Sequence, residues 1–189
     1  MEATIQQQPD LDGTYDTLSK TPTEFSTLHD HFPDMKRLAG RCDTIVEFGV
    51  WRAHGSTWAF LAGRPKRMIS LDIRYHINIE QVRQVAEDEG IDFHFVLGDS
   101  RAFEMPECDL LFIDSDHTYA QMRAELKHAP KVRRWILMHD TVTCWEKSIN
   151  SDEEGIGRAI EEFLEERPEW KIEWHRLHQN GLMLLERHP

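Results

Sequence analysis

The chain is poor in cysteine, and its few cysteines are badly spaced for structural roles. Cys42, Cys108 and Cys144 are odd in number, lie far apart and include no CxxC pair. Disulfide frameworks use paired cysteines, and zinc knuckles use closely spaced ones. The sequence therefore argues against both, and a reducing compartment is the simpler expectation.

Long apolar runs and an excess of basic charge are also missing. The apolar runs have the length of strands, well short of the ~20 residues that a membrane span requires, and no secretory leader is recognisable. Lys and Arg number 22 against 34 Asp and Glu, which gives a net charge of -12, whereas nucleic-acid binding needs clustered basic side chains. We expect a cytoplasmic protein whose partners include neither a membrane nor a nucleic acid.

Length and composition indicate a single globular domain. The 189 residues can bury one continuous core, and 40% hydrophobic with 30% charged residues is an ordinary balance for a folded protein. Residues 1–20 are polar and lack apolar periodicity, so we expect an N-terminal arm there and the domain over 21–189. Pro33 is expected to end or kink a helix near Phe32.

Short apolar runs alternate with helical patterns along most of the chain. Runs of strand length cover 44–48, 68–72, 93–97, 110–113 and 135–138, and apolar stripes at helical spacing lie between and after them. Two further strands around Asn180-Gly181 have the pattern of a hairpin. The sequence predicts an α/β fold, a Rossmann-like doubly wound and mostly parallel sheet with a C-terminal antiparallel hairpin.

Acidic residues follow five of the predicted strands. Ligands of open parallel sheets bind outside the carboxyl ends of the strands, so function is expected where the strands end. The residues concerned are Glu47, Asp72, Asp99, Asp114 and Asp140. A carboxylate that follows a strand can also cap the next helix, but five in succession favour a shared site.

The first predicted strand runs into a glycine-containing turn, Glu47 to Thr57. Gly49 and Gly55 would let a ligand approach the backbone closely, Ser56 opens the next helix, and Trp51 beside the turn is a candidate for the pocket wall. The turn does not match GxGxxG, which makes NAD a weaker choice than another nucleotide-like cofactor.

The next two strand ends suit an adenosine. Asp72 lies where a carboxylate can accept both hydroxyls of a ribose. Asp99 could accept a hydrogen bond from the exocyclic amine of an adenine, with the backbone of Ser100 assisting.

Oxygen and nitrogen donors gather after the fourth and fifth predicted strands. Asp114, His139 and Asp140 together suit a divalent cation such as Mg²⁺ or Mn²⁺, and zinc is less favoured because thiolates and multiple histidines are missing. His117 lies three residues after Asp114 and is the candidate general base.

Several strings resemble class I S-adenosylmethionine-dependent methyltransferases. They are Val46-Glu47-Phe48-Gly49-Val50, Ser56-Thr57-Trp58 and Ser70-Leu71-Asp72-Ile73. Ile113-Asp114, His117-Thr118-Tyr119 and His139-Asp140-Thr141 resemble more narrowly the branch of macrocin O-methyltransferases, rhamnosyl O-methyltransferases and cephalosporin hydroxylases. The resemblance covers roughly Asp43 to Arg187.

This resemblance implies a cofactor, a metal and a reaction. S-adenosylmethionine would be bound by Glu47, Gly49, Trp51, Gly55, Ser56, Asp72, Asp99, Ser100 and Asp114. Asp114, His139 and Asp140 would hold Mg²⁺ or Mn²⁺, and His117 would act as the base in O-methylation of a small, sugar-like or polyhydroxylated acceptor. His139 stands where related enzymes often have a glutamate, and the glycine turn is one residue longer than usual.

Two other functions remain open at this point. One is a non-catalytic S-adenosylmethionine-binding protein, and the other is a metal-dependent hydrolase that uses the same acidic and histidine residues. A small-molecule hydroxyl acceptor is the expected partner, and a homo-oligomer is left open.

Overall fold

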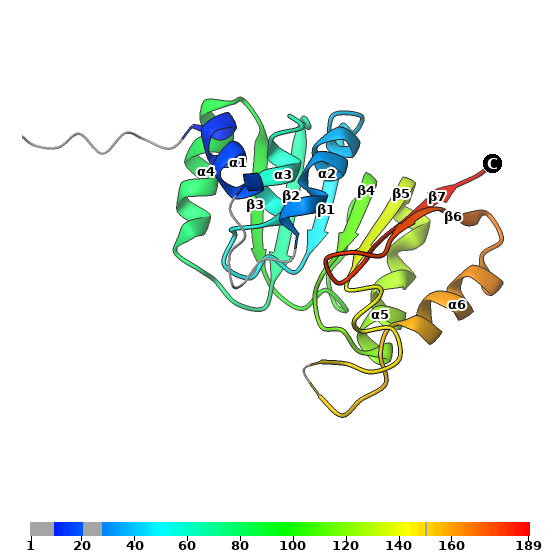
Figure 1. The fold of residues 1–189 in the computed structure, drawn as a ribbon. Coiled ribbons are helices and arrows are strands. Elements are labelled where there is room, and N and C mark those ends of the chain that lie inside the picture. The colour runs from blue at the N-terminus through cyan, green and yellow to red at the C-terminus, as the bar shows by residue number, and fades with distance from the viewer. Residues whose placement is uncertain (1–9, 21–27, 150) are drawn as a thin grey trace, which may run out of the picture.

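A computed structural model describes residues 10–20, 28–149 and 151–189. The strands are β1 (Thr44–Phe48), β2 (Arg67–Asp72), β3 (Asp92–Leu97), β4 (Cys108–Ile113), β5 (Val132–His139), β6 (Trp170–Arg176) and β7 (Leu182–Arg187). They form one sheet in the order β3-β2-β1-β4-β5-β7-β6 (Figure 1). β7 runs antiparallel to both of its neighbours, and the other pairings are parallel. The predicted fold class is confirmed.

Helices cover both faces of this sheet. They are α1 (Leu11–Lys20), η1 (His29–His31), α2 (Phe32–Ala39), α3 (Ser56–Leu61), α4 (Asn78–Asp88), α5 (Tyr119–Glu125), η2 (Leu126–Lys131) and α6 (Gly157–Glu166). Leu110 and Phe112 of β4 pack in one core cluster with α1 to α4, while Leu111 and Ile113 pack in the other with α5, η2 and α6. Since successive side chains of a strand point to opposite faces, a strand covered on both sides is apolar throughout.

The order of the strands reverses between β1 and β4. The chain builds outward from β1 to β3 and then returns to add β4 on the other side of β1. The loops after β1 and β4 therefore diverge, and they leave a crevice at the carboxyl ends of these strands. This topology locates the expected ligand site.

The β6–β7 turn docks against the loop after β5. Gln179, Asn180 and Gly181 all have positive φ, at 48°, 65° and 93°. The Asn180 carbonyl accepts from the Val142 amide at 2.8 Å, and the Gln179 carbonyl lies 3.1 Å from Nε2 of His139. The C-terminal hairpin thus reaches the edge of the sheet where the acidic residues gather.

The N-terminal region differs from the sequence-based expectation in two ways. Residues 11–20 form α1, whose Leu11 and Tyr15 are buried one turn apart, so these residues pack on the domain although their overall composition is polar. Pro33 lies in the first turn of α2 and so begins a helix, because a proline there has no helical hydrogen bond to lose. Residues 1–9 lie outside the described residues, as do 21–27. Within the described ranges, no helix has the length and apolarity needed to cross a membrane.

Asp109 ties three strands together at the amino end of the sheet. Its carboxylate accepts from the backbone amides of Asp43 and Thr44 at 2.7 and 2.9 Å. It also accepts from Nε of Arg133 on β5 at 2.9 Å. The side chain is buried, so its removal would leave half-buried amides without an acceptor.

Replacing Asp109 with Ala should therefore lower the free energy of unfolding by about 2–3 kcal/mol, as for the loss of hydrogen bonds to a charged group. Urea denaturation measures this change. Asp43→Ala is the matched control, because its side chain is 64% exposed and pairs with Lys66 at the surface, and a change below about 0.5 kcal/mol is expected. Equal losses in the two variants would contradict the role of Asp109.

Candidate functional site

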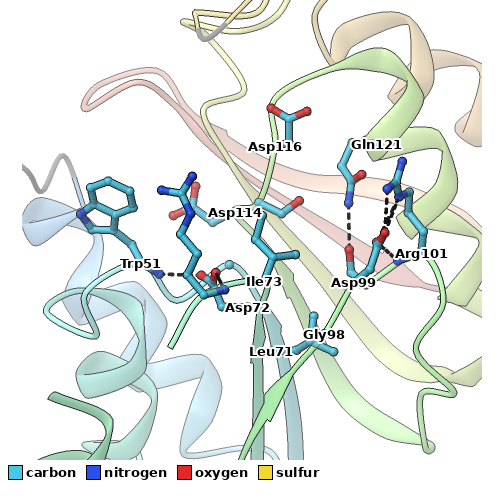
Figure 2. A pocket seen from close by; sticks show the side chains of 14 residues that line it. Trp51, Leu71, Asp72, Ile73, Gly98, Asp99, Arg101, Asp114, Asp116 and Gln121 are labelled. Atoms are coloured by element: carbon cyan, nitrogen blue, oxygen red, sulfur yellow. Dashed lines mark hydrogen bonds and ion pairs between the residues drawn. The ribbon is translucent and has the colours of Figure 1, made fainter. Parts of the chain in front are cut away.

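A pocket of about 410 Å³ opens at the carboxyl ends of β1 to β4 (Figure 2). Its volume lies within the usual range for small-molecule sites. The lining residues come from the loops after these four strands and from α5: Gly49, Trp51, Leu71, Asp72, Ile73, Arg74, Gly98, Asp99, Ser100, Arg101, Asp114, Ser115, Asp116 and Gln121. Four strand ends predicted from the sequence thus border one cavity.

The turn after β1 exposes main-chain atoms to this pocket, because Gly49 has no side chain. Gly49 has φ +87°, and a Cβ there would lie 2.0 Å from the carbonyl oxygen of Asp114. Only glycine fits this position. Trp51 and Ala53 also have positive φ, at 52° and 53°, so the turn is tightly coiled.

Asp72 holds this turn in place. Its Oδ2 accepts from the amides of Val50 and Trp51 at 2.8 and 2.9 Å, and its Oδ1 accepts from the Arg74 amide at 2.9 Å. A carboxylate has about four acceptor positions. At least one acceptor position of Asp72, which lines the pocket, therefore remains for a ligand hydroxyl.

Glu47 lies beneath the turn, outside the pocket lining. It is fully buried and accepts from the hydroxyls of Ser56, Thr57 and Ser70 at 2.5, 2.9 and 2.6 Å. Burial raises the pKa of Glu47 to about 7, although the three hydroxyls oppose the shift. Glu47 and Ser56 therefore join β1, β2 and α3, and Gly55 precedes that helix without lining the pocket.

The opposite end of the pocket carries a second carboxylate network. Both oxygens of Asp99 contact the guanidinium of Arg101, at 2.6 to 3.0 Å, and this pairing lowers the pKa of Asp99. Deeper in, Ser100 donates to the buried Glu125 at 2.5 Å. Burial raises the pKa of Glu125.

The amide of Gln121 has a defined orientation in this network. Its nitrogen donates to Ser100 Oγ at 2.8 Å and to Glu125 Oε1 at 2.9 Å. Because Ser100 gives its own proton to Glu125, its oxygen can only accept, and the neighbouring atom of Gln121 must be the nitrogen. Gln121, which lines the pocket, therefore keeps its carbonyl oxygen as an acceptor that is not used in this network.

Beside the pocket, two carboxylates and two imidazoles form a closed cluster. His117 Nε2 lies 3.3 Å from Asp114 Oδ1 and 2.8 Å from Asp140 Oδ2. His139 Nδ1 lies 3.3 and 3.2 Å from the same two oxygens. The four side chains predicted as metal ligands and base are thus brought together.

Charge is balanced inside this cluster. Burial alone would lower the pKa values of both imidazoles, but Asp114 and Asp140 raise that of His117 to about 11 and that of His139 to about 10. The imidazoles in turn lower the pKa values of both carboxylates. The carboxylates thus favour the protonated imidazoles, and the imidazoles favour the ionised carboxylates.

The same donors fit a divalent cation. One ligand atom each from Asp114, His139 and Asp140 lies within 4.8 Å of the others. Asp140 Oδ1 is buried and has no hydrogen-bond partner in the described part of the chain. Carboxylate oxygens with an imidazole suit Mn²⁺ and related ions, and a bound cation would take the place of the imidazole protons.

A third histidine adjoins the cluster from the N-terminal region. The ring of His31 is fully buried and lies 6.1 Å from that of His139 and 4.6 Å from that of His178, measured between centroids. Burial, together with the neighbouring His139 and His178, lowers the pKa of His31 to about 4. A neutral imidazole therefore covers this side of the cluster.

The structure places six of the nine expected cofactor residues at the pocket, namely Gly49, Trp51, Asp72, Asp99, Ser100 and Asp114. The sequence reasoning did not single out Gln121, Glu125, Arg101 or Cys144. The spacing of Gln121 and Glu125, four residues apart on a predicted helix, was a usable signal. Cys144 carried none, since a single cysteine in a loop has no pattern.

The described architecture is shared with solved methyltransferases. No protein-family model matches the chain, and no curated protein sequence matches it. Among solved structures, a methyltransferase of Podospora anserina bound to S-adenosylhomocysteine aligns with a TM-score of 0.62 at 16% identity, covering 96% of this chain and 89% of the other. An O-methyltransferase from Bacillus cereus, also in complex with S-adenosylhomocysteine, aligns at 0.60 and 16%, covering 97% and 93%.

A third structure extends the comparison. The O-methyltransferase TomG from Streptomyces achromogenes, in complex with S-adenosylmethionine, has a TM-score of 0.60 at 12% identity and covers 93% of this chain and 90% of its own. At these identities the likeness is one of fold. The chain therefore shares its Rossmann-like fold with these methyltransferases.

The buried Glu47 predicts a pH-dependent stability. Its pKa of about 7 in the folded protein lies above the ordinary value of 4.5, so the folded state prefers the protonated acid. The contribution of Glu47 to the free energy of unfolding should be greatest below pH 4.5. It should fall by about 3 kcal/mol in total as the pH rises to about 7.

Glu47→Gln should flatten this dependence, and urea denaturation between pH 4.5 and 8 measures it. Glu173→Gln, at an exposed position on β6, is the matched control and should follow the wild type. Parallel pH profiles for wild type and Glu47→Gln would show that the folded protein does not favour the protonated acid.

Proposed function

We propose that this protein is an S-adenosylmethionine-dependent methyltransferase that acts on a hydroxyl group of a small molecule. The observation that carries the proposal is the pocket at the β1–β4 switch point, where Gly49 exposes backbone and Asp72 and Asp114 border the same cavity. The solved structures with this fold that contain S-adenosylmethionine or S-adenosylhomocysteine support it.

The pocket offers complementary groups for each part of this cofactor. The coiled turn from Gly49 to Trp51 would receive the methionine part, where a backbone without side chain permits close approach. Asp72 would accept the ribose hydroxyls with its remaining acceptor capacity. At the far end, Ser100 and the oxygen of Gln121 would meet the adenine, with Asp99 at the rim.

Bound S-adenosylmethionine would supply an electrophilic methyl group for an in-line displacement. The chain's contribution is then to align an acceptor oxygen and remove its proton. His117 is the proposed base. It can accept a proton only when its own attraction to Asp114 and Asp140 is relieved, because these carboxylates keep it protonated at neutral pH.

A divalent cation held by Asp114, His139 and Asp140 would relieve that attraction and would lower the pKa of an acceptor hydroxyl. The cation and the proton of His117 compete for the same two carboxylates. Vicinal hydroxyls of a sugar-like or polyhydroxylated acceptor fit such a centre, and this assignment follows the family resemblance of the motifs around Asp114 and His139.

Isothermal titration with S-adenosylhomocysteine tests the cofactor. We expect binding by the wild type and a loss of more than about tenfold in affinity in Asp72→Ala, because two turn amides and a ribose would lose a charged acceptor. Asp92→Ala is the matched control, since Asp92 begins β3 at the opposite edge of the sheet. Failure of the wild type to bind would remove the methyltransferase proposal and favour a metal-dependent hydrolase.

The orientation of Gln121 predicts selectivity for the adenine amine. An analogue of S-adenosylhomocysteine with hypoxanthine in place of adenine presents an oxygen to the Gln121 oxygen, so it should bind at least about tenfold more weakly. Gln121→Leu should reduce the ratio between the affinities for the adenine and the hypoxanthine ligand. Gln84→Leu on the surface of α4 should leave this ratio unchanged. Equal affinities of the wild type for both ligands would refute the assigned role of Gln121.

A further inference from the structure

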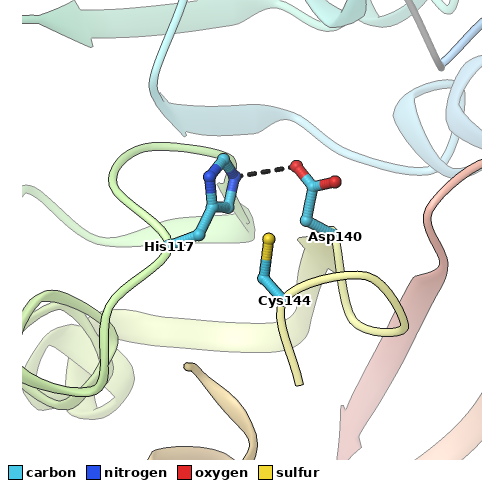
Figure 3. A group of neighbouring side chains, drawn as sticks. All are labelled: His117, Asp140 and Cys144. Atoms are coloured by element: carbon cyan, nitrogen blue, oxygen red, sulfur yellow. Dashed lines mark ion pairs between the residues drawn. The ribbon is translucent and has the colours of Figure 1, made fainter. Parts of the chain in front are cut away.

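The turn after β5 places a buried thiol beside the carboxylate and imidazole cluster. The side chain of Cys144 is fully buried, and Figure 3 shows its sulfur directed toward the space between His117 and Asp140. One ligand atom from each of these three residues lies within 4.8 Å of the others. Sulfur, nitrogen and oxygen donors therefore converge at one place.

The backbone fixes Cys144 in this position. The Cys144 amide donates to the Asp140 carbonyl at 2.9 Å, which closes a turn of helical spacing and puts both side chains on one side. The Cys144 carbonyl accepts from the Ile156 amide at 2.9 Å. A Cβ at Gly155 would lie 2.1 Å from that carbonyl oxygen, so the two segments pack in direct contact.

Donor capacity at this place is not used up by the protein itself. His117 Nε2 and Asp140 Oδ2 are 2.8 Å apart, but Nδ1 of His117 and Oδ1 of Asp140 are buried and have no hydrogen-bond partner within the described ranges. Buried polar atoms are normally satisfied, so this unpartnered pair marks a place for an ion, a ligand or an ordered water. Burial raises the pKa of the Cys144 thiol, while His117 and a backbone hydrogen bond from Ile149 oppose the shift.

We propose that His117, Asp140 and Cys144 bind a divalent transition metal of the Zn²⁺ class. A thiolate, an imidazole and a carboxylate are all established zinc ligands, and three of them leave a fourth tetrahedral position for water or a substrate oxygen. Mg²⁺ prefers oxygen donors throughout and gains nothing from the thiol. The thiol therefore sets the metal preference of this centre.

Binding requires that the ligands lose their protons. The thiol proton of Cys144 and one imidazole proton of His117 leave to solvent as the metal bonds form. The thiolate and the Asp140 carboxylate then carry two negative charges, which the divalent ion neutralises in a buried setting. Asp114 and His139 remain in contact with His117 and Asp140 and would orient them.

This inference goes beyond the proposed function, and it changes what His117 can do in the proposed reaction. A metal on His117 takes the lone pair that a general base needs, so zinc occupancy and proton acceptance by His117 exclude each other. The two donor sets share Asp140. An ion that prefers oxygen ligands, bound at Asp114, His139 and Asp140, would leave His117 available to accept a proton. An ion of the zinc class would bind His117 and prevent this.

Cobalt substitution tests the thiol ligand directly. The metal-free full chain is titrated with Co²⁺, and we expect the near-ultraviolet absorption of a sulfur-to-cobalt charge transfer. Cys144→Ser should lose this band and bind Zn²⁺ more than roughly tenfold more weakly. Cys42→Ser, which changes another buried cysteine in the core cluster of Leu110 and Phe112, is the matched control and should keep the band. A large excess of Mg²⁺ should not remove it.

Three results would overturn the proposal: a wild type without the band, a Cys144→Ser protein that keeps it, or displacement of Co²⁺ by Mg²⁺. Circular dichroism of each variant confirms that it is folded. Titration with S-adenosylhomocysteine separates the two proposals. If the protein binds S-adenosylhomocysteine but shows no cobalt band, only the proposal of a thiol ligand is contradicted. If it shows the cobalt band but does not bind S-adenosylhomocysteine, only the proposed methyltransferase function is contradicted.

Discussion

The close approach of the Gly49 and Asp114 backbones is the contact on which both halves of the site depend. β1 and β4 are neighbours at the point where the strand order reverses, and the Asp114 amide donates to the Phe48 carbonyl at 2.8 Å. Any side chain at position 49 would collide with the Asp114 carbonyl. Because the two loops part directly beyond this contact, Asp114 borders the pocket on one side and meets the histidines on the other.

Buried acids support the pocket from below at both of its ends. Glu47 lies under the turn after β1 and Glu125 lies under the loop after β3, and each is surrounded by hydroxyl or amide donors. Burial favours the protonated form of both. Their function is to fix Ser56, Ser100 and Gln121 in place. The acids that face the cavity, Asp72 and Asp99, are instead held by backbone amides and an arginine.

The sequence was sufficient to predict which edge of the sheet carries the site. Apolar runs marked the strands, and the acidic residue after each run marked its end, because parallel strands end at the same edge. The residue pattern did not predict in which direction each of these side chains points. Glu47 is the last residue but one of β1, and its side chain points into the protein, where Ser56, Thr57 and Ser70 surround it.

Other features depended on backbone conformations that leave no mark in a residue pattern. Asp140 has φ +56°, and this left-handed residue turns the chain so that Cys144 comes back toward the end of β5. The helix over residues 11–20 was missed although Leu11, Tyr15 and the half-buried Leu18 lie at helical spacing, because the other residues of this short segment are polar or glycine. Both depend on contacts with residues distant in the sequence.

The docking of the β6–β7 turn onto the loop after β5 has a consequence for synthesis on the ribosome. Nε2 of His139 contacts the Gln179 carbonyl, and the amides of Val142 and Thr143 donate to the Asn180 carbonyl. A nascent chain that has emerged as far as Cys144 already contains every member of the carboxylate, imidazole and thiol group, yet it lacks the segment that closes over it. Completion of this centre must therefore wait for the hairpin, which makes its assembly a late event that reports on the folding of the whole sheet.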